Sequence, residues 1–426
     1  MSATKIDTTT THRTVAAVWR IESAKVIASL ARIVRDVGIA EELAQDALLA
    51  AIEQWPQAGV PDNPGAWLMT TAKHRAIDKL RRDELLERKH TELAHELESA
   101  LDDSAAMADA ALDDPIGDDV LRLVFTACHP VLGPEARIAL TLRMLGGLAT
   151  DEIARAFLVP EATIAQRIVR AKRALSDAQV PFEVPRGGEL GARLASVLEV
   201  IYLIFNEGYT ATAGDDWMRP QLCEEATRLG RILVGLMPEE AEVHGLLALM
   251  ELQASRTHAR TGPDGEPILL LEQNRARWDQ LLIGRGLASL QRAQKLGGAQ
   301  GRYTLQAAIA ACHARARAPE DTDWKEIARL YAELAAVAPS PVVELNRAVA
   351  VGMAFGPAAG LEIADALTAE PVLKSYHLLS TVRADLLEKL GRRTEARAEY
   401  ERAANLTRNE RERQLLLQRA ARAAAN

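Results

Sequence analysis

Residues 150–175 read TDEIARAFLVPEATIAQRIVRAKRAL, and this stretch decides how the rest of the chain is interpreted. The residue pattern predicts a short helix over 151–157, capped by Thr150, and a second helix after the turn Leu158-Val159-Pro160. Proline stops one helix and is tolerated in the first turn of the next. The second helix carries an inward stripe at helical spacing, made of Ile164, Ile168, Ala171 and Leu175. The pattern predicts a helix-turn-helix, with an ordinary helical hairpin as the alternative.

The polar side of the second helix carries the first group of candidate DNA contacts. Outside the apolar stripe lie Thr163, Gln166, Arg167, Arg170, Lys172 and Arg173. A helix with one buried apolar edge and a polar, cationic outer face suits the major groove of duplex DNA. The alternative is a solvated face, which arginines also form on ordinary surface helices.

Composition favours an all-helical protein without catalytic machinery. Hydrophobic residues make up 48% of the 426 residues and aromatic residues only 4%, while alanine, leucine, arginine and glutamate are abundant. No glycine-rich phosphate loop, H-E-x-x-H or Ser/His/Asp set occurs, so we expect neither an enzyme nor a cofactor. Cys128, Cys223 and Cys312 lie far apart, which indicates a reducing compartment and no metal site. The absence of an apolar leader or membrane-length apolar run predicts a cytoplasmic protein.

A second basic helix is predicted earlier in the chain, over residues 64–87. Trp67 leads it, and the candidate phosphate contacts follow: Lys73, His74, Arg75, Lys79, Arg81 and Arg82. An aromatic residue ahead of a basic face suits single-stranded nucleic acid, because a base can stack on the ring while cations hold phosphates. A solvated face is again the alternative.

The two basic helices are separated by an acidic stretch. Residues 83–119 contain thirteen acidic and two basic residues, a net charge of −11 within a chain of net charge −8. The remainder therefore carries about +3. We predict an acidic linker that shields the basic modules or lies in a basic channel of a partner, with plain solubility as the alternative.

A weak repeat is visible near the C-terminal end. Residues 376–390 and 394–406 predict a helix pair, and small or aromatic residues stand where a tetratricopeptide repeat (TPR) has them: Ala384, Leu387, Gly391, Ala396, Tyr400 and Ala403. One unit earlier, Ala348 aligns with Ala384, but Gly360 stands where the repeat prefers alanine. We therefore expect a helical, TPR-like array that buries its apolar faces by stacking.

The order of these modules resembles a known family. Residues 63–82, NPGAWLMTTAKHRAIDKLRR, resemble the second conserved region of the extracytoplasmic-function (ECF) sigma factors of the sigma-70 family, and residues 161–173 resemble the recognition helix of its fourth region. Residues 202–209, 307–314 and 341–350 are similar to the TPR-like C-terminal extension of one subgroup. The expected division is a disordered tail (1–12), a region 2 module (13–87), an acidic linker (88–116), a region 4 module (117–179), a Pro/Gly linker (180–188) and a TPR-like domain (189–426).

The resemblance implies an RNA polymerase sigma factor with a regulatory C-terminal domain. Its expected partners are core RNA polymerase, through the β′ clamp and the β flap, and promoter DNA at the minus-ten and minus-thirty-five elements. The helix over 39–54 would dock on the clamp, with Glu41, Glu42 and Asp46 as contacts. A small YCII-related (DGPF) protein is a further expected partner. Pro160 departs from the family pattern, because it replaces the usual hydroxyl cap and removes about 1 kcal/mol of capping.

Two other classes stay open at this point. A one-component transcription regulator would join the helix-turn-helix to a helical sensing domain and bind duplex DNA without polymerase. A scaffold would use the repeat array alone. The module around Trp67 argues against the regulator, because a plain repressor does not need to bind single strands. In the scaffold, the basic helices would be incidental.

Overall fold

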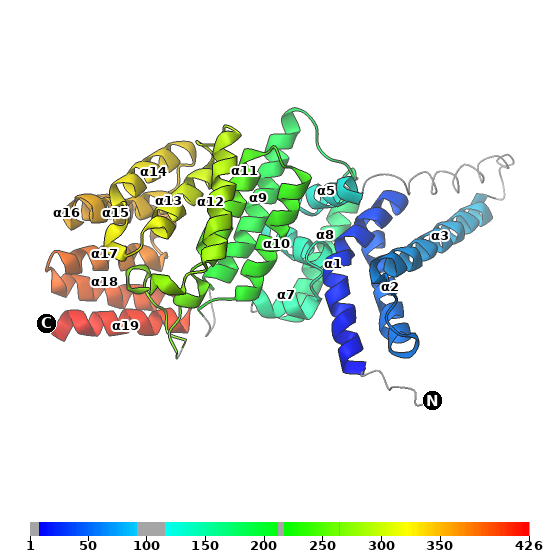
Figure 1. The fold of residues 1–426 in the computed structure, drawn as a ribbon, viewed down its shortest axis with the longest axis horizontal. Helices are drawn as coiled ribbons and strands as arrows, with labels where there is room; N and C mark the ends of the chain where they lie inside the picture. Colours follow the sequence, from blue (N-terminus) through cyan, green and yellow to red (C-terminus); the bar gives the residue numbers. More distant parts are fainter. Residues whose placement is uncertain (1–7, 92–115, 158, 212–216, 264, 426) are drawn as a thin grey trace. The chain divides into compact units, whose positions relative to one another are not determined.

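The computed structural model describes residues 8–91, 116–157, 159–211, 217–263 and 265–425. Every regular element within these ranges is a helix, apart from one isolated bridge between Thr261 and Pro267. The all-helical prediction is therefore confirmed. The chain divides into two compact units, Met1–Val200 and Ile201–Asn426 (Figure 1). This division falls inside a helix and not at the expected linker, residues 180–188. The expected domain boundaries therefore stay predictions.

The first unit contains two groups of helices. The first group is α1 (Thr8–Val34), α2 (Val37–Ala58) and α3 (Pro64–Thr91). The second group is α5 (Ile116–Ala127), α6 (Pro134–Met144), α7 (Thr150–Phe157) and α8 (Glu161–Asp177). Helix α9 (Gly188–Tyr209) begins here, where Ser196 donates to the Cys128 carbonyl at 2.7 Å and Arg193 donates to the Phe125 carbonyl at 3.0 Å.

Helices of the first group are longer than the sequence suggests. Helix α1 begins at Thr8, so the expectation that residues 8–12 are disordered is wrong, and residues 1–7 lie outside the described ranges. Helix α2 starts behind Asp36, whose carboxylate accepts the Ile39 N–H at 2.9 Å. It continues past Trp55, which is 1% exposed and holds the last turn in the core. The predicted acidic linker lies mostly outside the described residues, and its first part continues α3.

The helix-turn-helix is present where the spacing places it, as α7 and α8. Ile164, Ile168, Ala171 and Leu175 are buried, as predicted. Thr150 is the first helical residue, so the cap position falls on Ala149 and not on Thr150 as predicted. The Glu152 carboxylate accepts the Ala149 N–H at 2.8 Å. Pro160 precedes α8 without a side-chain cap, as its missing hydroxyl requires.

The second unit continues as a series of helices, and from α10 onward each packs on the next helix in the chain. After the end of α9 come α10 (Pro220–Leu236), α11 (Ala241–Ala254), α12 (Gln280–Lys295), α13 (Arg302–Arg315), α14 (Trp324–Val337), α15 (Pro341–Phe355), α16 (Pro357–Ala366), α17 (His377–Lys389), α18 (Arg393–Leu406) and α19 (Glu410–Ala425). Short 3₁₀ turns lie at 257–259, 270–272, 275–277, 319–321, 367–369 and 371–373. Figure 1 shows α17, α18 and α19 side by side at the C-terminal end.

The predicted helix pair near the C-terminus is formed by α17 and α18. Ala384, Ala396 and Ala403 are fully buried, and the buried Tyr400 donates its hydroxyl to Glu388 at 2.7 Å. In the preceding pair, a Cβ on Gly360 would lie 2.5 Å from the Ala348 carbonyl oxygen, so α15 and α16 are too close for alanine there. The helical array is therefore present, while its assignment as a TPR stays a prediction.

Candidate nucleic-acid interface

The outer face of α8 is open to a ligand. Gln166, Val169, Arg170 and Arg173 are exposed, whereas Thr163 and Arg167 are half-buried. Within the described part of the chain, the side chains of Gln166, Arg167 and Arg170 make no hydrogen bond or ion pair, and Arg173 lies 3.4 Å from Asp177 on its own helix. Val169 is 64% exposed between these polar groups. It was not among the predicted contacts, although an exposed apolar residue in a major groove suits a thymine methyl group.

Helix α3 presents an aromatic and cationic stripe. Trp67, His74 and Arg81 are separated by seven residues each, so they share one side of the helix, while Leu68, Ala72 and others are buried on the opposite side. The Trp67 ring meets the buried Trp55 ring edge-on, with centroids 5.4 Å apart. Trp55 thus fixes the orientation of Trp67, a support that sequence reasoning missed because Trp55-Pro56 resembles a helix end.

The other predicted α3 contacts lie off this stripe. Arg75 lies 3.5 Å from Asp46 of α2, and Arg82 is exposed and donates to the Asp78 carbonyl at 3.1 Å. Lys79 is half-buried. Lys73 is also half-buried, and burial together with the nearby Arg32 lowers its pKa. The structure therefore separates Trp67, His74 and Arg81 from the remaining cations.

Helix α2 separates the three acidic residues that were predicted to bind polymerase. Glu42 and Asp46 are exposed on one side of the helix, together with Leu49, which is 56% exposed. Glu41 points the other way and is 4% exposed. Only Glu42 and Asp46 are therefore accessible to a partner in this structure.

Glu41 joins the two groups of helices in the first unit. Its carboxylate accepts from Arg143 Nε of α6 at 2.8 Å and from Lys172 Nζ of α8 at 2.5 Å. We call these three residues the Glu41 contact. Lys172, which was grouped with the DNA-reading residues, thus faces α2 and not the outer face of α8. Arg143 was not singled out by the sequence.

Three neighbouring contacts reinforce the Glu41 contact. Gly147 has a φ of +65°, and a Cβ there would lie 2.7 Å from Ser23 Oγ of α1. Arg20 lies 2.9 Å from Glu152 at the surface. Arg32 lies 3.1 Å from Asp119, whose side chain is 2% exposed. The two helix groups therefore form one closed body in the free chain.

The aromatic and basic stripe of α3 and the open polar face of α8 occur in the two segments that match sigma-70 family models. Residues 21–85 match sigma-70 region 2 and residues 122–175 match sigma-70 region 4. The ECF RNA polymerase sigma factor SigK of Mycobacterium ulcerans (strain Agy99) is 31% identical over 156 residues, which cover 35% of this chain and 78% of SigK. The chain belongs to the ECF sigma factors of the sigma-70 family, which are not enzymes.

One relative and one family model extend the comparison to the second unit. An uncharacterised protein of Rhizobium meliloti (strain 1021) is 43% identical over 387 residues, 90% of each chain. The probable ECF sigma factor SigI of Mycobacterium tuberculosis (strain ATCC 25618 / H37Rv) is 26% identical over 173 residues, 41% of this chain and 58% of SigI. Residues 193–294 match DUF6596, a family of unknown function. Among the described helices, none is long and apolar enough to cross a membrane.

Proposed function

We propose that this sigma factor directs core RNA polymerase to specific promoters by reading the two promoter elements with α3 and α8. The observation that carries the proposal is the open polar face of α8, where Gln166, Arg167 and Arg170 make no hydrogen bond or ion pair within the described residues. Gln166 suits adenine, and Arg170 suits guanine or phosphate at the minus-thirty-five element. Trp67 would stack an unpaired base of the minus-ten element while His74 and Arg81 hold the strand.

Polymerase docking would use the exposed stripe of α2. Glu42 and Asp46 offer charge and Leu49 offers apolar area to the β′ clamp, while the region 4 module would bind the β flap. If α2 and the region 4 module bind separate surfaces of polymerase, the Glu41 contact would open when the factor binds. The free, closed chain is then a resting form, and the factor would work in the cytoplasm.

The second unit would regulate this activity as a TPR-like array. The support is its stacked helix pairs, with small residues at the closest approaches and neighbouring helices in continuous contact. A YCII-related (DGPF) protein is a partner that such an array could hold. The alternative function, a one-component helix-turn-helix regulator, gives the Trp67 stripe no role.

The test is transcription from a cognate promoter with core polymerase and the full chain. Arg170→Ala and Trp67→Ala should each lower transcript yield, whereas Arg155→Ala, which removes an exposed arginine paired with Asp151 on α7, should not. Copurification with core polymerase is expected as well. Tight binding to duplex DNA without polymerase, together with no copurification, would favour the one-component regulator.

A further inference from the structure

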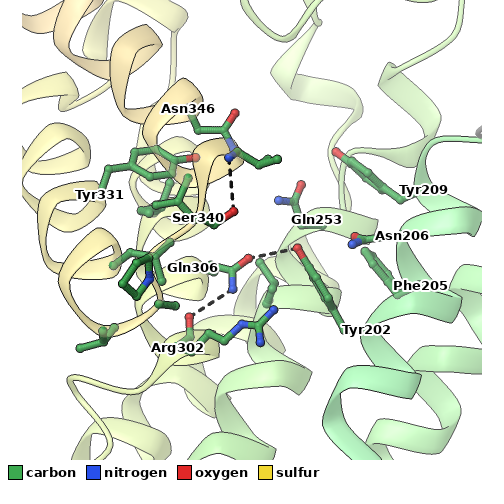
Figure 2. Close-up of a pocket in the computed structure, with 18 residues that line it drawn as sticks. Tyr202, Phe205, Asn206, Tyr209, Gln253, Arg302, Gln306, Tyr331, Ser340 and Asn346 are labelled. Atoms are coloured by element: carbon green, nitrogen blue, oxygen red, sulfur yellow. Dashed lines mark hydrogen bonds between the residues drawn. The ribbon is translucent and has the colours of Figure 1, made fainter. Parts of the chain in front are cut away.

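A cavity of about 720 Å³ lies within the second unit, between the end of α9 and helices α11, α13, α14 and α15. Figure 2 shows the Tyr202 and Tyr209 hydroxyls and the Gln253 amide directed toward the same space, with Tyr331 and Asn346 across from them. No carboxylate is among the lining residues, and Arg302 is exposed at the edge. A volume of this size suits a drug-sized molecule. We name it the C-terminal cavity.

A cluster of arginines lies directly behind the wall of the C-terminal cavity. Arg256 Nη2 donates to the Tyr209 hydroxyl at 2.5 Å and also to Gln253. The Arg260 guanidinium lies 3.5 Å from the Tyr209 ring centroid and donates to the Tyr209 carbonyl, although Arg260 is only 6% exposed. Two lining residues are thus held by two cations.

Among the described residues, the arginines behind this wall form no ion pair, although Asp321 and Glu320 lie close enough to act on Arg275. Arg275, the third member of the cluster, donates to the carbonyls of His313 and Ala316 at 2.9 and 2.8 Å. Within the described residues, none of Arg256, Arg260 and Arg275 has a carboxylate within ion-pair distance. Buried charge without a partner is costly, and an anion bound nearby offsets that cost.

The pKa values of two neighbouring groups, His313 and Tyr331, are shifted. Burial, followed by the charges of Arg256 and Arg275, lowers the pKa of His313 to about 3. Because His313 is then neutral at physiological pH, it adds no further positive charge. Burial likewise raises the pKa of Tyr331 to about 12, so its phenol stays protonated and can donate.

The hydrogen bond from Arg256 also orients Tyr209. The phenol oxygen accepts from the guanidinium, which leaves the phenol proton free to donate toward the cavity. Hydrogen bonds that involve charged groups are shorter and stronger than neutral ones. The Tyr209 hydroxyl therefore joins the half-buried Arg256 to a ligand in the cavity.

We propose that the C-terminal cavity binds a small organic anion with a planar aromatic body. Its charged group would accept from the Tyr209 hydroxyl and the Gln253 amide, in the field of Arg256 and Arg260. Its ring system would lie against the tyrosine rings, and Arg302 would cover the open edge of the cavity. Control of transcription by this ligand rests on the proposed function, but ligand binding itself does not.

The experiment compares two probes on the full chain, without polymerase or DNA. The anionic probe is 8-anilinonaphthalene-1-sulfonate, and the neutral probe is N-phenyl-1-naphthylamine, which has the same rings without the sulfonate. Fluorescence titration should give one saturable site that binds the sulfonate about tenfold or more tightly than the neutral amine. Equal affinities for the two probes, or several unsaturable sites, would overturn the proposal.

Variants locate the site. Arg256→Gln keeps a donor for Tyr209 but removes the charge, so it should reduce the preference for the anion about tenfold. Tyr209→Phe should act in the same direction without touching a charge, which keeps the test valid if Arg256→Gln fails to fold. Arg285→Gln, on the exposed side of α12, is the matched control and should leave both affinities unchanged. An equal loss in Arg285→Gln would mean surface binding and refute the site.

Discussion

Replacing Glu41 by glutamine should open the closed form of the first unit. The substitution keeps the size of the side chain and one acceptor oxygen, but it removes the charge that Arg143 and Lys172 share. Those two side chains are only 18% and 16% exposed, so neither is well solvated while the helices stay together. The two cations would then face a neutral amide and each other.

The magnitude follows from this burial. Breaking a buried ion pair by removing one partner costs about 3–5 kcal/mol. The lower value applies here, because both cations can reach water by moving a short distance. A cost of about 3 kcal/mol shifts the equilibrium between closed and open forms by roughly 150-fold.

Distance measurements on the free chain can test this shift. Labels at Gln54 of α2 and Ser176 of α8, both exposed, report the separation of the two helix groups, in a background where the partly exposed Cys312 is replaced by serine. Glu41→Gln should add a population at longer distance. Glu42→Gln is the matched control, because Glu42 has a 73% exposed side chain and lies 4.0 Å from Lys172. Identical distributions for the two variants would refute the importance of the Glu41 contact.

Four further outcomes are expected. Arg170→Ala should weaken binding to the cognate minus-thirty-five element by about 1–3 kcal/mol and relax specificity at one base pair, measured by titration of promoter variants with holoenzyme. Trp67→Ala should reduce promoter opening by about 1–3 kcal/mol, seen as lower permanganate reactivity of unpaired thymines, while binding of holoenzyme to the closed promoter changes little. His313 has a pKa lowered to about 3, so its contribution to stability is present above pH 6.5 and is lost as the pH falls toward 3; urea unfolding at pH 7 and 5 should differ less in His313→Gln than in the parent chain. Gly360→Ala should lower the free energy of unfolding by about 1–3 kcal/mol, whereas Gly284→Ala, which adds its methyl group to open space, should not lower it.

Local features of the fold were predictable from the sequence. Pro160 predicts the turn, and the apolar spacing after it predicts the buried side of α8. Both signals act within a few residues of the feature they predict. The helix pair α17 and α18 was predictable for the same reason. Helix ends were less predictable, since the burial of Trp55 carries α2 beyond the point where Trp55-Pro56 suggests a stop.

Long-range pairing was not predictable. Lys172 and Glu41 are 131 residues apart, and no spacing rule connects them, so each was assigned to an external partner. The Pro/Gly-rich stretch at 180–188 correctly indicates irregular backbone before α9. It does not indicate that α9 itself begins packed on α5, because composition reports chain flexibility and not tertiary contact. The C-terminal cavity was missed for a similar reason, as its walls come from several helices.

The burial of Glu41 has a consequence for how the factor responds to osmotic stress. A shielded ion pair is screened little by added salt, whereas protein contacts to promoter phosphates weaken steeply. Added salt should therefore weaken promoter binding more than it weakens the Glu41 contact. Genes that depend on this factor should be transcribed less in hyperosmotic medium, and transcription should recover on dilution without new synthesis of the protein.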